Sequence, residues 1–105
     1  MSTLRRILFF TSTALLFLIS GCKVPIASFI YSPESVKVGD TVYFQSTSQN
    51  AISFKWDFGD DTGSTGEHPI HIYQSAGEYP VFLEVYNQLG SDKTSETITV
   101  STSSP

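Results

Sequence analysis

The sequence predicts an all-β fold, a β-sandwich, in the part of the chain that follows residue 25. Apolar and polar residues alternate in several short runs, which is the pattern of strands with one buried face. Glycine, proline, asparagine and aspartate separate these runs, as turn residues do between the strands of a sandwich. We find no sustained amphipathic helical pattern and no internal repeat, so a helical or repeat architecture is not expected.

The expected strands follow one another at short intervals. Their apolar positions lie within six stretches: Ala27–Tyr31, Val42–Phe44, Ile52–Phe58, Ile70–Tyr73, Tyr79–Val85 and Ile98–Val100. In the third stretch the alternation places Ile52, Phe54, Trp56 and Phe58 on one face, which we expect to be buried. The stretch that ends at Tyr73 is shorter and less regular. About a dozen inward side chains, each contributing about 1.5–3 kcal/mol on burial, would form a core sufficient for a small domain.

The first 21 residues are expected to be a cleavable signal peptide and not part of the fold. Arg5 and Arg6 precede an apolar run, Ile7–Ile19, of 13 residues. A run of this length suits a signal peptide and is shorter than the roughly 20 residues that span a bilayer as a helix.

The residues after this run, Ile19-Ser20-Gly21-Cys22, resemble the lipobox of bacterial lipoproteins. This resemblance implies that diacylglycerol alkylates the Cys22 thiol and that the chain is cut before Cys22. Cys22 is the single cysteine, so none would remain for a disulfide, a metal or nucleophilic catalysis. The alternative is an ordinary signal peptide or membrane anchor with an incidental cysteine. By the same resemblance, Lys23 stands where Asp would retain a lipoprotein in the inner membrane, which favours the outer membrane in a Gram-negative cell.

Removing 21 of the 105 residues leaves 84, for which we expect three parts. Residues 22–25 would be a short tether that holds the domain near the membrane, 26–100 the folded domain, and 101–105 a disordered tail. Four lysines against ten acidic residues give this mature chain a net charge of −6. A nucleic-acid partner requires basic surface and is therefore not expected.

Several separated motifs resemble the polycystic-kidney-disease (PKD) domain, over about Pro25 to Val100. They are Trp56-Asp57-Phe58-Gly59-Asp60, Pro69-Ile70-His71-Ile72-Tyr73, Gly77-Glu78-Tyr79-Pro80-Val81-Phe82-Leu83-Glu84-Val85 and Asn87. The resemblance implies an immunoglobulin-like sandwich of about seven strands that serves adhesion, spacing or ligand contact and not catalysis. One position departs from the family, because Asp61 stands where the signature has glycine.

The acidic stretch from Asp57 to Asp61 is predicted to be a structural turn. Gly59 can adopt positive φ at little cost, and the carboxylates of Asp60 or Asp61 can accept hydrogen bonds from backbone amides two residues on. We expect Gly63 and Gly66 to absorb the change caused by Asp61. The Asp-Phe-Gly tripeptide lacks the other motifs of a kinase, and the spacing of oxygens does not fit an EF-hand. Since some PKD domains are described as calcium-binding, a weak calcium site at Asp57, Asp60 and Asp61 is the alternative.

The two histidines do not predict a metal site. His68 and His71 are three apart on a strand and would face opposite sides of the sheet. His71 falls at the histidine position of the family, and we expect it to be a structural hydrogen-bonding residue near the turn. The chain has no nucleophile elbow, so we expect neither an enzyme nor a cofactor.

Outward-facing aromatic residues are the candidates for binding. Strand parity sends Phe82 and Tyr86 to the outer face of the sheet that carries Lys55, and it sends Tyr43 outward between Val42 and Phe44. Such a surface suits an envelope protein or, alternatively, a polysaccharide such as peptidoglycan. The structural alternative is that Phe82 and Tyr86 are strand formers packed on cross-strand neighbours.

Overall fold

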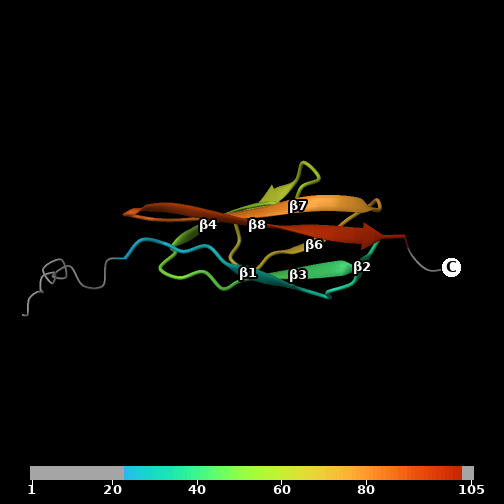
Figure 1. Cartoon of the computed structure of the whole chain (residues 1–105), viewed down its shortest axis with the longest axis horizontal. Helices are drawn as coiled ribbons and strands as arrows, with labels where there is room; N and C mark the ends of the chain where they lie inside the picture. The colour runs from blue at the N-terminus through green and yellow to red at the C-terminus, as the bar shows by residue number, and fades with distance from the viewer. Residues whose placement is uncertain (1–22, 103–105) are drawn as a thin grey trace, which may run out of the picture.

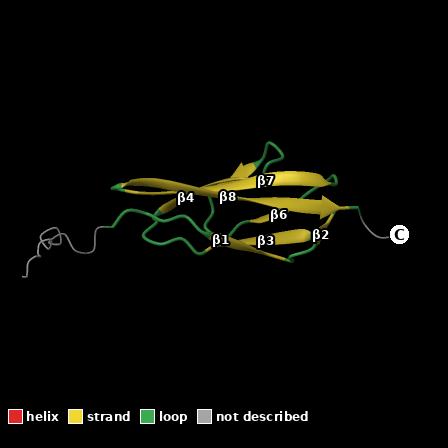
Figure 2. Cartoon of the chain, in the orientation of Figure 1, coloured by secondary structure: helices red, strands yellow, loops and turns green. Residues whose placement is uncertain are grey.

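The structure, a computed structural model, describes residues 23–102. These residues form eight strands and no helix: β1 (Phe29–Ser32), β2 (Val36–Lys37), β3 (Thr41–Ser46), β4 (Ser53–Asp57), β5 (Gly63–Ser64), β6 (Ile70–Ile72), β7 (Gly77–Asn87) and β8 (Gly90–Ser101). Figure 2 shows that strands and their connections make up the whole described chain. The predicted all-β class is confirmed.

The strands form two layers, a three-stranded sheet of order β1-β3-β6 and a five-stranded sheet of order β2-β8-β7-β4-β5 (Figure 1). The long β7–β8 hairpin forms the centre of the larger sheet. Its register runs from Gly77 opposite Val100 to Asn87 opposite Gly90. β4 pairs antiparallel with the other side of β7. The eight strands agree with the expected number of about seven, and two of them, β2 and β5, have only two residues each.

The core fills the space between the two layers. Twelve hydrophobic residues are buried there, among them Phe29, Phe44, Trp56 and Leu83. The Trp56 ring lies 5.1 Å from the Phe29 ring and 5.4 Å from the Phe44 ring, between centroids, so aromatic side chains of both sheets meet at the centre. The Trp56 Nε1–H donates to the Gly66 carbonyl at 2.8 Å, which gives its one polar atom a partner.

The prediction that Ile52 is buried was wrong. Its side chain is 69% exposed, whereas Trp56 and Phe58 are buried and Phe54 is partly buried. β4 begins at Ser53, after Ile52, and Figure 1 shows that β7 and β8 extend beyond the end of the smaller sheet at this point. Strand parity alone therefore did not bury Ile52, because no opposing layer covers it.

The two ends of the sandwich differ in what they carry. The chain enters at the end that holds the β7–β8 turn and the connection from β3 to β4, and it leaves at the opposite end, where β2 pairs with β8 (Figure 1). Ser101 is the last residue of β8, and its carbonyl accepts a hydrogen bond from Val38 N at 2.9 Å. Between residues 23 and 102 no helix is long and apolar enough to cross a membrane.

Candidate functional site

The acidic turn between β4 and β5 is held by hydrogen bonds between its own groups. Asp57 Oδ1 accepts from Gly59 N at 2.9 Å, and Asp60 Oδ1 accepts from Thr62 N at 3.2 Å. Phe58 N donates to the Thr62 carbonyl at 3.0 Å and closes the loop. Each of these two carboxylates accepts from an amide two residues on, in the way that Asx turns replace the hydrogen bonds of a strand that has ended.

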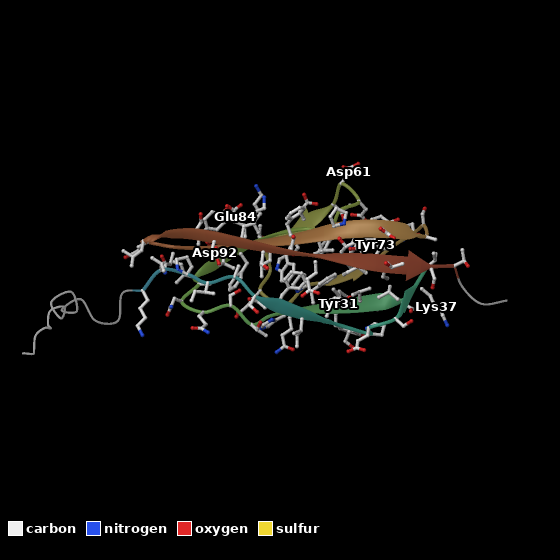
Figure 3. The ribbon with its side chains drawn as sticks, viewed as in Figure 1. Tyr31, Lys37, Asp61, Tyr73, Glu84 and Asp92 are labelled. Atoms are coloured by element: carbon white, nitrogen blue, oxygen red, sulfur yellow. The ribbon has the colours of Figure 1, made fainter. Side chains whose placement is uncertain are left out.

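Two residues of the turn lie in the left-handed region, Gly59 with φ of 87° and Asp61 with φ of 70°. Asp61 therefore adopts the conformation that the family's glycine would supply, and the expectation that Gly63 and Gly66 absorb the change was wrong. Aspartate tolerates this region better than most residues, so the replacement is compatible with the turn. Figure 3 shows the Asp61 side chain at the outer tip of the loop.

Asp60 and His71 form the polar centre of this region. The His71 Nε2–H donates to Asp60 Oδ2 at 2.7 Å, and the imidazole stacks on the Phe58 ring with centroids 4.3 Å apart. Partial burial acts to raise the pKa of Asp60, but hydrogen bonds from Thr62 and His71 outweigh it and hold that pKa below its usual value. His71 thus connects β6 to the turn.

The buried tyrosine Tyr73 completes this cluster from the core side. Its hydroxyl donates to the Phe58 carbonyl at 2.8 Å, and its ring meets His71 edge-on at 4.7 Å between centroids. Burial raises the pKa of Tyr73 far above its usual range. Figure 3 shows Tyr73 between the two layers.

The three carboxylates of the calcium hypothesis do not converge. Asp57 and Asp60 accept from different backbone amides, and no three acidic, histidine or cysteine side chains within residues 23–102 form a group that could hold a metal ion. The Nδ1 atom of His68 accepts a hydrogen bond from Ser46 N, in β3, at 3.2 Å. In the structure this region is a turn stabilised by its own hydrogen bonds.

The predicted aromatic face on the larger sheet is only half exposed. Phe82 is opposite Asp57, Tyr86 is opposite Ser53, and Lys55 lies between them opposite Glu84. The Lys93 ammonium lies 4.9 Å from the centre of the Phe82 ring, and a hydrogen bond with Glu84 raises the pKa of Tyr86. Phe82 and Tyr86 therefore have neighbours on their own sheet, as cross-strand packing would provide.

Tyr43 lies on the other sheet, at the centre of an apolar surface. Ile70 is directly opposite Tyr43, while Ile30 and Ile72 occupy diagonal positions on the neighbouring strands. The exposed fractions are 55% for Ile30, 59% for Tyr43, 59% for Ile70 and 41% for Ile72. We call these four residues the isoleucine–tyrosine face. A flat ligand on this face would not touch Phe82, Tyr86 or Lys55.

Sequence reasoning did not single out Ile30, Ile70 and Ile72 as surface residues. Strand parity would have predicted their exposure. Because His71 and Tyr73 point inward, residues 70 and 72 must point outward. Ile30 likewise stands between inward-facing Phe29 and Tyr31. In such a short run, the parity of the neighbouring residues predicts burial better than the apolar character of the residue itself.

A shallow hollow of about 330 Å³ lies at the end where the chain enters, lined by residues that include Lys23, Ala51, Ile52 and Leu89. The predicted tether comprises residues 22–25, and Lys23 and Val24 of this segment are bonded to the sandwich here. Asn87 Nδ2 donates to the Lys23 carbonyl at 2.7 Å, and Asn50 Nδ2 donates to the Val24 carbonyl at 3.2 Å. The predicted lipidation site Cys22 lies outside the described residues.

Comparison with known proteins identifies a family and several relatives. The family model of the PKD domain matches residues 22–102. Collagenase ColQ1 of Bacillus cereus strain Q1 is 44% identical over 46 residues, which is 44% of this chain and 5% of the collagenase. The chain spans only 5–9% of the length of the curated relatives that it matches.

Solved structures with the same fold include the PKD1 domain of the Vibrio cholerae metalloprotease PrtV, with 34% identity and a TM-score of 0.64 over 75% of this chain and 99% of that domain. A second structure, solved to explain the promiscuous specificity of carbohydrate-binding modules from the β-sandwich superfamily, has 30% identity and a TM-score of 0.71. This match covers 76% of the chain and 35% of the other.

Proposed function

Since the chain belongs to the PKD domain family, we propose that it is a non-catalytic binding module, held at a membrane by lipid on Cys22 and acting in the cell envelope. The collagenases and metalloproteases that it resembles are many times longer, and the chain matches only a small part of each. Their proteolysis is therefore not carried over to this chain. We assign it no cofactor and no nucleic-acid partner.

The observation that carries the binding role is the isoleucine–tyrosine face. The largest contiguous apolar patch on a soluble monomer is often a binding site, and here four exposed apolar residues are neighbours on one sheet. Tyrosine is also enriched in protein interfaces, where its ring supplies area and its hydroxyl a hydrogen bond. We propose that an envelope protein covers this face.

The lipid anchor rests on the lipobox Ile19-Ser20-Gly21-Cys22, and the position of Lys23 after the cysteine favours the outer membrane in a Gram-negative host. Several acyl chains make release from a bilayer slow, since each buried methylene contributes about 0.8 kcal/mol. Metabolic labelling with radioactive palmitate should label the wild-type chain and not Cys22→Ser, which should leave the membrane fraction. Unlabelled, soluble wild-type protein would refute the anchor.

Site-specific photo-cross-linking in the native host tests the binding face. A photoreactive amino acid at Tyr43 should capture a defined envelope protein, identified by mass spectrometry, and Ile70→Ser should abolish that capture. The same probe at Lys55, on the outer face of the other sheet, is the matched control and should not capture it. Equal capture from both positions would refute the assignment of this face.

A carbohydrate ligand is the second candidate, favoured by the similarity to the structure solved for carbohydrate-binding modules and by the exposed Tyr43 ring. Retention on insoluble peptidoglycan or another cell-wall polysaccharide should then fall on Tyr43→Ala. The Phe82→Ala and Tyr86→Ala variants serve as controls, because both residues lie on the other sheet. Retention that depended on Phe82 and Tyr86 and not on Tyr43 would move the proposed site to the larger sheet.

A further inference from the structure

The end of the sandwich at which the chain enters exposes a second apolar cluster. Val24 is 61% exposed, Ile52 69% and Leu89 54%. The three residues come from separate segments, the entering chain, the connection from β3 to β4, and the β7–β8 turn, and Ile52 and Leu89 line the hollow at this end. We call them the entry-end cluster. It lies at the tip of the sandwich, and the isoleucine–tyrosine face lies on its side (Figure 1).

Hydrogen bonds hold the entering segment against this end. Asn87 Nδ2 donates both to the Lys23 carbonyl and to the Asn50 carbonyl, each at 2.7 Å. Ile26 then pairs with Gln49 through two backbone bonds, of 3.0 and 2.9 Å. The direction of the chain at Lys23 is thus set by the sandwich, and Cys22 precedes Lys23 directly in the sequence.

The charge at the hollow itself suits a lipid surface. Lys23 is the one charged residue among those that line the hollow. Glu78 stands nine residues before Asn87 on β7, about 30 Å away at 3.3 Å per residue. Asp40, whose carboxylate accepts from Lys37 N, lies at that far end as well. Among nearby acids, Asp92 has its Oδ2 engaged with Ala27 N at 2.8 Å.

We infer that the entry-end cluster is a membrane-docking surface, which places Val24, Ile52 and Leu89 at the boundary between headgroups and acyl chains and Lys23 beside lipid phosphate. The inference rests on the proposed lipid at Cys22, which would bring the bilayer to this end. Tethering raises the effective concentration of the lipid surface at the cluster, so a small apolar area suffices. Docking fixes the orientation of the domain and directs the far end, which carries Lys37, Asp40 and Glu78, away from the membrane.

Depth-dependent fluorescence quenching tests this orientation. The full-length lipidated protein is reconstituted in vesicles of phosphatidylethanolamine and phosphatidylglycerol that contain nitroxide-labelled lipid. Lipidation consumes the Cys22 thiol, so a dye on Gln88→Cys, in the β7–β8 turn, reports on the entry end alone. The matched control is a dye on Lys37→Cys, at the opposite end. We expect strong quenching at position 88 and little at position 37.

A pair of double variants then identifies the residues responsible. Ile52→Ser with Leu89→Ser should remove most of the quenching at position 88 while the protein still sediments with the vesicles. Ile70→Ser with Ile72→Ser removes two equally apolar residues from the isoleucine–tyrosine face and should leave the quenching unchanged. Because Trp56 is buried in the core, its fluorescence verifies that every variant is folded.

The outcomes separate the docking surface from the anchor. Equal quenching at positions 88 and 37, in protein that mass spectrometry shows to be lipidated, would overturn the docking surface and leave the anchor intact. Concentration-dependent energy transfer between dyes at position 88, without lipid quenching, would show that a second copy covers the cluster and would also overturn it. An unmodified Cys22 would refute the anchor and the docking surface together.

Discussion

At the residue scale, Asp60 determines how the acidic turn responds to pH. Its carboxylate accepts from Thr62 and from the His71 imidazole, and these bonds stabilise the charged form. This contact is partly shielded from water, because the exposed fractions of the two side chains are 22% for Asp60 and 15% for His71. The turn is therefore attached to β6 by an interaction that requires an ionised Asp60.

The lowered pKa of Asp60 predicts a loss of stability in acid. The contribution of Asp60 is complete above its ordinary pKa of 3.8 and is lost as the pH falls through the lower pKa of the folded state. Denaturant unfolding between pH 5 and pH 2 should show a steeper fall in the free energy of unfolding for wild type than for Asp60→Asn. Parallel curves for the two proteins would contradict this assignment.

Gly59 is predicted to be difficult to replace, because both its backbone conformation and its surroundings oppose a side chain. Its φ is 87°, and an added Cβ would lie 2.7 Å from the Pro80 carbonyl oxygen, in the central strand β7. The Gly59→Ala variant should lose about 1–2 kcal/mol for the left-handed conformation and a further 1–3 kcal/mol for overpacking.

Gly39 is the control for that substitution. Its φ of 90° is similar, but an added Cβ would meet nothing within 4 Å. Gly39→Ala should therefore show only the conformational loss in urea unfolding. Equal losses for the two alanine variants would show that the contact with Pro80 has no energetic consequence.

At the scale of elements, strand parity was the reliable part of the sequence prediction. The alternation within β3 and β7 placed Val42, Phe44, Val81 and Leu83 in the core, and all four are buried. Parity failed at Ile52, outside its strand, where exposure depends on how far the facing sheet extends. A one-dimensional pattern holds no information on the length of the opposing layer.

Neighbouring residues of β3 should differ sharply in their effect on stability. Phe44 is buried among the rings of Phe29, Trp56 and Phe58, so Phe44→Ala should cost about 3–5 kcal/mol. Tyr43→Ala removes an exposed side chain with cross-strand neighbours such as Ile70 and should cost about 0.2–1 kcal/mol. Chemical denaturation measures both, and similar losses would contradict the two-layer arrangement.

At the scale of the whole molecule, the attachment of residues 23–27 decides how the domain is oriented relative to anything bound before it. A tether was expected at residues 22–25, but Asn87 and Asn50 hold Lys23 and Val24 on the sandwich, and Asp92 holds Ala27 just after them. No signal in the entering residues themselves predicted this, because the partners lie 26 to 65 residues away in the chain.

Asn87→Ala should loosen this attachment without unfolding the domain. The variant removes the hydrogen bonds to the carbonyls of Lys23 and Asn50. Hydrogen exchange should become faster at the amides of Ile26 and Ala27 and stay unchanged at Val85 in the core. Uniformly faster exchange at all three amides would instead indicate global destabilisation.

The sequence by itself determined the all-β class, the alternation of core residues and the position of the acidic turn. These features are local, because they depend on strand parity and on side chains that bond amides two residues away. The tertiary structure alone decided that Tyr43 has three isoleucines as neighbours, that Ile52 and Leu89 line one hollow at the end where Val24 enters, and that the entering segment is attached there. Each of these depends on which distant segments become neighbours and on where one layer stops covering the other, and only packing in three dimensions sets both.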